Sequence, residues 1–215
     1  MRRLEEQEMF EIEILEWMKN NNFLGNLIFG GGTMLRLCYD LNRFSLDLDF
    51  WTYRIHDEKS FYEKINSSIA RSYEVTDSAF KLQTILFEIR KANIPGKLKI
   101  EIRKNENQWD FQEKIAFSKY SNKQILVKVF TLEQMMKNKI AALLERKEIR
   151  DAFDLEFIAK KGIALIADVR DLQMIKQIIS KFSLQNYKVA LGSLLEQEQR
   201  KFYAENNFSY LLSKI

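Results

Sequence analysis

The sequence has few of the residues that cross-link a chain, interrupt regular elements or bind zinc. Among its 215 residues there are one cysteine, one histidine, one proline and seven glycines. The single cysteine, Cys38, excludes an internal disulfide. Together with the single histidine, His56, it provides too few ligands for a Cys/His zinc site. We expect Cys38 to be a small buried apolar residue and His56 to lie at the surface or in a loop. The shortage of proline and glycine favours long helices and strands.

Long apolar runs are also missing. No run approaches the roughly 18 residues of a membrane span, and the acidic start, MRRLEEQEMFEIEIL, is unlike a signal peptide. We therefore expect a cytoplasmic protein with no membrane partner. Hydrophobic residues make up 46% and charged residues 30% of the chain, which is typical of a globular protein. The net charge of +4 favours a polyanionic partner such as a nucleotide or nucleic acid, and a mixed-charge surface explains it equally well.

Apolar periodicity divides the chain near residue 130 into a mixed half and a helical half. We predict an α+β protein with two domains, an α/β core over 1–130 and a helical domain over 131–215. A capping box, Thr131 with Gln134, begins the helical half. The predicted helices are 4–19, 34–41, 58–71, 132–146, 150–160, 168–182 and 187–205, and the predicted strands are 23–29, 46–51, 80–90, 97–103 and 124–130, with a turn at 93–96.

The most informative motif is Leu46-Asp47-Leu48-Asp49-Phe50, in which apolar and acidic residues alternate. Side chains two residues apart in a strand share a face, so Asp47 and Asp49 project together while their neighbours face the core. Adjacent carboxylates repel each other unless a cation lies between them, and hard oxygen ligands suit Mg²⁺ or Mn²⁺. The alternative is an edge strand with a solvated acidic face.

Two further features would complete such a site. Gly31, Gly32 and Thr33 follow a predicted strand and precede a helix, where exposed backbone N–H groups suit a phosphate. A plain tight turn is the alternative. Glu101 lies in a strand whose apolar residues alternate onto the opposite face, and it would supply a third carboxylate for metal or act as a general base. The alternative is an exposed glutamate between two cations.

The helical half contains a lysine on an apolar face. Lys139 is four residues from both Met135 and Leu143, so it shares their side of the helix. It either extends along the apolar surface to reach water or is directed at a nucleotide whose charge it would neutralise. Arg146 flanks the same face. Asp151 and Asp154, three residues apart on the next helix, are expected to pair with these cations or to form ordinary surface pairs.

Taken in order, these segments resemble the AbiEii/AbiGii family of nucleotidyltransferases, which are toxins of bacterial and archaeal toxin–antitoxin systems. The resemblance covers about residues 27–160. It rests on Gly31-Gly32-Thr33-Met34-Leu35, Arg43-Phe44-Ser45-Leu46-Asp47-Leu48-Asp49-Phe50, Glu101, the segment from Thr131 to Lys139, and Arg150-Asp151-Ala152-Phe153-Asp154-Leu155.

The resemblance implies a nucleotidyltransferase-fold core, a mixed sheet with flanking helices, followed by a helical C-terminal part. It also implies that the chain is an enzyme that uses an NTP and acts on a tRNA 3′ end or a protein hydroxyl, with a cognate antitoxin as partner. By the same resemblance, the metal ligands are Asp47, Asp49 and Glu101, the phosphate-binding residues are Gly31, Gly32 and Thr33, the nucleotide-binding residues are Lys139 and Arg146, and Asp154 supports catalysis.

Two functions follow from these patterns. The first is a Mg²⁺-dependent or Mn²⁺-dependent transfer of an NMP to an acceptor. The second is a non-catalytic module on the same fold that binds a nucleotide or a protein partner. A glutamate at 101, where relatives often carry aspartate, motivates this second function.

Overall fold

The computed structural model describes residues 2–92, 94, 96–105 and 107–215. Contacts between Cα atoms divide the chain into two compact units, which we call the sheet unit and the helical unit. The sheet unit comprises Met1–Asp40 and Phe44–Phe130, and the helical unit comprises Leu41–Arg43 and Thr131–Ile215. The short segment Leu41–Arg43 was not expected in the helical unit, because three residues carry no periodicity. None of the described helices is both long enough and apolar enough to cross a membrane.

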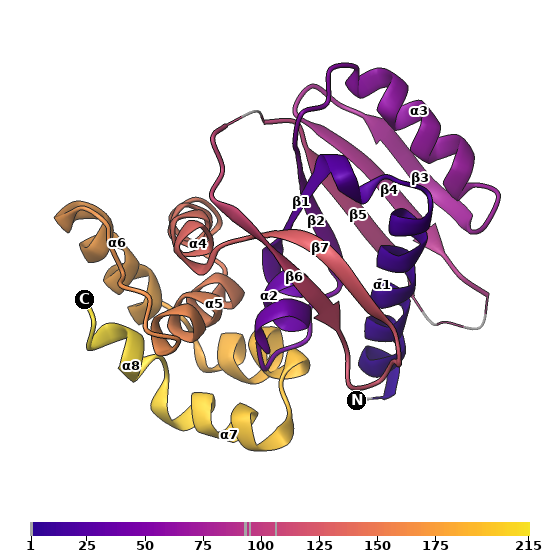
Figure 1. The fold of residues 1–215 in the computed structure, drawn as a ribbon. Helices are drawn as coiled ribbons and strands as arrows, with labels where there is room; N and C mark the ends of the chain where they lie inside the picture. Colours follow the sequence, from indigo (N-terminus) through magenta and orange to yellow (C-terminus); the bar gives the residue numbers. More distant parts are fainter. Residues whose placement is uncertain (1, 93, 95, 106) are drawn as a thin grey trace. The chain divides into compact units, whose positions relative to one another are not determined.

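Within the described residues, seven strands form one mixed sheet in the order β3-β4-β5-β2-β1-β7-β6 (Figure 1). The central strand β2 runs antiparallel to β1 and parallel to β5, and β1 runs parallel to β7. Sheet and helices together confirm the predicted α+β class. The strands are β1 (Leu27–Gly30), β2 (Asp47–Thr52), β3 (Glu74–Phe80), β4 (Thr84–Arg90), β5 (Leu98–Arg103), β6 (Phe111–Phe117) and β7 (Gln124–Phe130).

The helices of the sheet unit are α1 (Arg2–Asn20), α2 (Gly31–Tyr39) and α3 (Glu58–Ile69), with a 3₁₀ turn η1 (Leu24–Asn26) before β1. Helix α1 packs against β5 and β7. The apolar residues of β2 and β5 lie in the core as their alternation predicts, with Leu48, Phe50 and Ile102 fully buried. The acidic positions between them are therefore left on the other face of the sheet.

Both edge strands were missed by the sequence analysis. Strand β3 (EVTDSAF) has only exposed and intermediate positions, and strand β6 (FQEKIAF) adds one buried position, Ala116, because an edge strand covers only part of the core. The predicted strand 80–90 begins only at Thr84, since residues 81–83 form the turn of the β3–β4 hairpin, where the Lys81 N–H donates to the Thr84 carbonyl at 2.8 Å. Asn93 and Pro95 of the predicted turn lie outside the described residues.

The helical unit contains α4 (Leu132–Arg146), α5 (Ile149–Lys160), α6 (Val169–Ser180), α7 (Gln197–Asn206) and α8 (Ser209–Leu212). Thr131 caps α4 as predicted, because its hydroxyl oxygen accepts the Gln134 N–H at 3.2 Å. The Gln134 side chain points toward the next turn of α4, where it donates to Asn138 Oδ1 at 2.9 Å.

The prediction of one helix over 187–205 was wrong. A π-helical turn, η2 (Asn186–Leu191), leads into a 3₁₀ turn, η3 (Gly192–Leu194), and the backbone at Leu195 is extended. Gly192 permits this tight passage, since a Cβ there would lie 2.9 Å from the Tyr187 carbonyl oxygen. The extended residue then forms an isolated β-bridge with Arg43.

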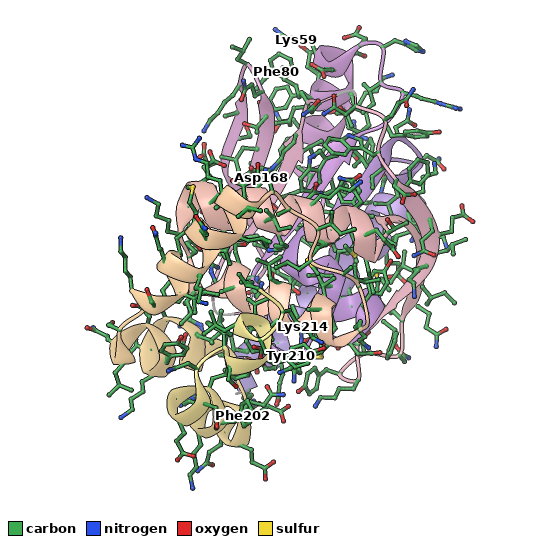
Figure 2. All side chains as sticks on the ribbon, turned by 90° about the vertical axis from the view of Figure 1, so that its left-hand side faces the viewer. Lys59, Phe80, Asp168, Phe202, Tyr210 and Lys214 are labelled. Atoms are coloured by element: carbon green, nitrogen blue, oxygen red, sulfur yellow. The ribbon has the colours of Figure 1, made fainter. Side chains whose placement is uncertain are left out.

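Aromatic side chains fill the C-terminal part of the helical unit. The Tyr203 ring lies 4.9 Å from that of Phe153 and 5.5 Å from that of Phe208, measured between centroids. Its neighbour Phe202, labelled in Figure 2, is 47% exposed, and its ring centroid lies 5.2 Å from that of Tyr203. The aromatic core therefore fixes α7 and α8 despite their shortness.

Candidate active site

Carboxylates from two adjacent strands share one face of the sheet. In the parallel register of β2 and β5, Asp49 is the partner of Glu101 and Asp47 is the partner of Lys99. The burial patterns of both strands alternate, with these positions half-buried and the positions between them buried. The sequence prediction that Asp47 and Asp49 project together is therefore confirmed, and Glu101 lies on the same face.

The Asp49 carboxylate lies against the glycine turn between β1 and α2. Gly30 pairs with Asp49 across the strands, and Gly31 begins α2 with φ +74. A Cβ at Gly31 would lie 2.2 Å from Asp49 Oδ2 and 2.9 Å from its Cγ, well inside contact distance. The absence of a side chain at Gly31 thus makes the space that the Asp49 carboxylate fills.

Thr33 has a different contact from the one that its motif suggests. Its hydroxyl is fully buried and donates to the Asp47 carbonyl oxygen at 2.6 Å. The hydroxyl therefore holds the first residue of β2 against α2, and the phosphate contact predicted for Thr33 would have to come from its backbone N–H. Thr33 links the glycine turn to the first aspartate, as Gly31 does to the second.

Basic side chains accompany Glu101 on β5. Lys99 Nζ lies 2.6 Å from Glu101 Oε2, and Arg103 Nε lies 3.5 Å from Glu101 Oε1. The hydrogen bond to Glu101 is the largest influence on Lys99 and raises its pKa; burial lowers it, and the charges of Glu101, Asp47 and Asp49 raise it further. Among the described residues, no three His, Cys, Asp or Glu side chains are in position to hold a metal ion. The carboxylates share a face, but Glu101 is turned to its cations.

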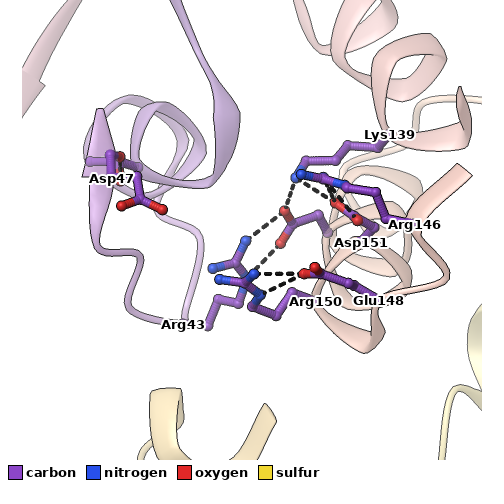
Figure 3. Close-up of polar contacts among 9 residues, drawn as sticks. Arg43, Asp47, Lys139, Arg146, Glu148, Arg150 and Asp151 are labelled. Carbon is purple, nitrogen blue, oxygen red and sulfur yellow. Dashed lines mark hydrogen bonds and ion pairs between the residues drawn. The ribbon is translucent and has the colours of Figure 1, made fainter. Parts of the chain in front are cut away.

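Lys139 lies in a buried ion-pair network of the helical unit (Figure 3). Its Nζ is 3.0 Å from Asp151 Oδ1 and 2.6 Å from Asp154 Oδ2. Arg146 Nη2 donates to both Asp151 oxygens, at 2.9 and 3.0 Å. Lys139 is buried, as its place on the apolar face predicts. Of the two alternatives for Asp151 and Asp154, the structure shows pairing with Lys139 and Arg146 rather than ordinary surface pairs.

Arg43 completes this network from the segment Leu41–Arg43. It makes a bidentate contact with Asp154, from Nε to Oδ1 and from Nη2 to Oδ2, both at 2.7 Å. Burial raises the pKa of Asp154, but Arg43 and Lys139 outweigh it and hold the pKa below its ordinary value of 3.8. Asp154 is therefore an ionised carboxylate with two cationic partners, despite being fully buried.

Comparison with known proteins identifies the family of the chain. The family described as "Nucleotidyl transferase AbiEii toxin, Type IV TA system" matches residues 14–206. This chain belongs to the AbiEii family. It is therefore a nucleotidyltransferase of the type IV toxin–antitoxin class, with an NTP as substrate and an antitoxin as the implied partner, in a family that generally uses a divalent metal.

Solved structures show that the AbiEii chain has a nucleotidyltransferase fold. JHP933 from Helicobacter pylori is 20% identical, with a TM-score of 0.58, and the match covers 95% of this chain and 92% of that one. A second H. pylori protein, classed as a nucleotidyltransferase, is 20% identical with a TM-score of 0.57 and 95% coverage of both chains. At this identity the likeness concerns the fold. Among curated proteins, none matches the chain.

The AbiEii chain also contains buried polar residues that sequence analysis missed. Glu11 of α1 is fully buried, and neither of its carboxylate oxygens has a hydrogen-bond partner among the described residues. Burial raises the pKa of Glu11 well above the ordinary 4.5; Glu8 and Asp47 also raise it, while Arg36 lowers it. A helical spacing of three and four residues places Glu8 and Glu11 on the same side as the core residues of α1, which was the available signal.

Proposed function

We propose that this protein transfers an NMP from an NTP to a hydroxyl of a tRNA 3′ end or of a protein, with Mg²⁺ or Mn²⁺ as cofactor. The observation that carries the proposal is the Asp49 carboxylate, which fills the space left by Gly31 and is the cross-strand partner of Glu101. Asp47, Asp49 and Glu101 are the proposed metal ligands. In this proposal, β2 and β5 supply the carboxylates that bind the metal, and the start of α2 supplies the N–H groups that bind the phosphates of the nucleotide.

The residues present fit a divalent metal in their chemistry and their register. All three are hard oxygen donors on one face of adjacent strands. The Asp49 carboxylate fills the space left by the missing Cβ of Gly31, which fixes its direction. Metal binding requires Glu101 to exchange a cationic partner for the ion, because Lys99 and Arg103 contact its two oxygens. A bound metal would neutralise phosphate charge and orient the triphosphate.

The transfer step uses the protein's own groups for proton movement and phosphate contact. The acceptor oxygen forms a bond to the α-phosphorus while the bond from that phosphorus to the β-phosphate oxygen breaks, and pyrophosphate leaves. Glu101 is the proposed acceptor of the hydroxyl proton. The N–H groups at Gly31, Gly32 and Thr33, at the start of α2, would bind phosphate oxygens.

In the helical unit, Lys139 and Arg146 are the proposed nucleotide-binding residues and Asp154 the proposed supporting carboxylate. Lys139 forms ion pairs with both Asp151 and Asp154, and Arg146 Nη2 donates to both carboxylate oxygens of Asp151. Such a network fixes the direction of long cationic side chains, which lowers the entropy lost when they bind phosphate.

Transfer of label from NTPs tests the proposal. Wild-type protein is incubated with each α-labelled NTP, Mg²⁺ or Mn²⁺, and total tRNA or candidate proteins. We expect label in one acceptor class, and Asp49→Ala should abolish it while circular dichroism remains unchanged. Asp77→Ala is the matched control, since Asp77 is an exposed aspartate of edge strand β3. Absence of label with every metal and acceptor would count against the enzyme.

A non-catalytic binding module is the second candidate, and the contacts of Glu101 with Lys99 and Arg103 favour it. Calorimetry with an NTP and Mg²⁺ separates the two functions. Metal-dependent binding that Asp47→Ala removes supports a working site. Metal-independent binding that Asp47→Ala leaves intact supports the module.

A further inference from the structure

Lys99 occupies a particular place in the register of the sheet. It is the direct partner of Asp47 across the β2–β5 pair, and it lies two residues before Glu101, on the same face. Its Nζ contacts Glu101 Oε2 at 2.6 Å. The ammonium group therefore belongs to the same face as Asp47, Asp49 and Glu101, the three proposed metal ligands.

Electrostatics explains why a cation is needed there. Three carboxylates on neighbouring positions of two strands repel one another, and like charges on directly opposed strand positions destabilise a sheet. The Lys99 ammonium opposes that repulsion in the metal-free protein.

We propose that Lys99 is a counter-cation for the carboxylates of Asp47, Asp49 and Glu101, and that it competes with the divalent metal for them. This inference rests on the metal site proposed above. With metal absent, Lys99 stabilises the carboxylates and holds Glu101; when metal binds, Glu101 leaves the ammonium. Lys99 thereby sets the metal affinity of the site, acting through Glu101 as a positioning residue.

The sign of the effect separates this role from that of an ordinary supporting residue. If Lys99 competes with metal, its removal strengthens metal binding, because one positive charge no longer repels the ion and Glu101 is released. If Lys99 only orients Glu101 for the metal, its removal weakens metal binding. The Lys99 side chain is 42% exposed, so solvent screening keeps the effect modest.

The experiment measures Mn²⁺ binding by calorimetry, without nucleotide, in wild type, Lys99→Met, Lys99→Arg and Lys97→Met. Lys97 is the matched control, because it pairs with Glu88 rather than with the proposed metal ligands. We expect Lys99→Met to bind Mn²⁺ roughly three- to tenfold more tightly at low salt. Lys99→Arg and Lys97→Met should resemble wild type, and raising the salt concentration should reduce the difference.

A second readout is the melting temperature without metal. Lys99→Met should melt about 1–3 °C lower than wild type when metal-free, and saturating Mn²⁺ should remove the difference. Equal or weaker Mn²⁺ binding by Lys99→Met, in a protein whose wild type binds Mn²⁺, overturns the inference and leaves the proposed function standing. Failure of both wild type and Lys99→Met to bind Mn²⁺ overturns the metal site itself.

Discussion

Removal of the Asp154 carboxylate is the sharpest test of the ion-pair network in the helical unit. Asp154 accepts two hydrogen bonds from Arg43 and an ion pair from Lys139. The side chains of Arg43 and Lys139 are only 3% and 9% exposed. Asp154→Ala therefore removes a carboxylate that two nearly buried cations share.

The expected loss follows from this burial. Breaking a buried ion pair by removing one partner costs about 3–5 kcal/mol, which is a large share of the roughly 5–15 kcal/mol that stabilises a typical protein. Lys139 retains Asp151 at 3.0 Å, so we expect the lower half of this range. Asp154→Asn keeps an acceptor for Arg43 and should lose about 2 kcal/mol.

Urea unfolding at neutral pH, followed by far-UV circular dichroism, measures this loss. The three tryptophans, Trp17, Trp51 and Trp109, all lie in the sheet unit, so their fluorescence reports on that unit alone. Glu148→Gln is the control, because the Glu148–Arg150 pair is 41% exposed at both side chains and should contribute under about 1 kcal/mol. A loss below about 1 kcal/mol for Asp154→Ala would refute the reasoning that these charges are desolvated.

Three further predictions follow from single contacts. Thr33→Val should cost about 1–2 kcal/mol in urea unfolding, because it removes the buried donor to the Asp47 carbonyl, and Thr33→Ser should restore most of it. Acid lowers the stability of the wild type through Asp154: its pKa is depressed when folded, so the stabilisation is present above the unfolded value near 3.8 and is lost as the pH falls through the folded pKa. In Asp154→Asn, the free energy of unfolding should therefore fall less steeply as the pH is lowered. Glu11 acts with the opposite sign: its pKa is raised when folded, so its contribution is present below the unfolded value near 4.5 and is lost as the pH rises through the folded pKa. Glu11→Gln should therefore be more stable than wild type at alkaline pH, and a pH series of melting temperatures in which the two proteins stay parallel would contradict this.

The fold could be predicted where one residue spacing dominates a segment. Strand β7 and helix α4 have the predicted bounds, since their apolar residues repeat at the strand and helix periods. The edge strands β3 and β6 have no such alternation, because partial burial leaves room for polar residues on both faces. The C-terminal helices were merged in the prediction, because the break near Gly192 depends on a contact with Arg43, about 150 residues earlier in the chain.

In the site, too, contacts between residues close in sequence could be predicted, whereas contacts between distant segments could not. Spacing alone placed Asp47 and Asp49 on one face and offered Lys139 and Arg146 as partners for the aspartates of α5, because those are neighbour relations within a strand or between adjacent helices. The contacts of Glu101 with Lys99 and Arg103 were among the alternatives that the sequence offered, because both cations lie two residues from Glu101 on β5. The burial of Glu11 had a signal in its helical spacing, but its lack of hydrogen-bond partners among the described residues had none. The bidentate contact of Arg43 could not be predicted, since it depends on which distant segments meet.

The glycine turn and the D-x-D motif are two separate patterns in the sequence, and the structure makes them one. From the sequence, the glycine turn is predicted to bind phosphate through its N–H groups, yet Asp49 already requires the absence of a Cβ at Gly31, because such a Cβ would lie 2.2 Å from Asp49 Oδ2. Gly31→Ala should therefore displace Asp49 and remove Mn²⁺ binding even without nucleotide. Gly162→Ala is the matched control, because Gly162 has a positive φ of +91 and a Cβ added there would meet open space. This variant therefore measures the backbone strain alone, about 1 kcal/mol, without a collision like that between a Cβ at position 31 and Asp49. If Gly31→Ala kept its Mn²⁺ affinity and lost no more stability than Gly162→Ala, the glycine would serve the turn alone, and the link between the two motifs would be wrong.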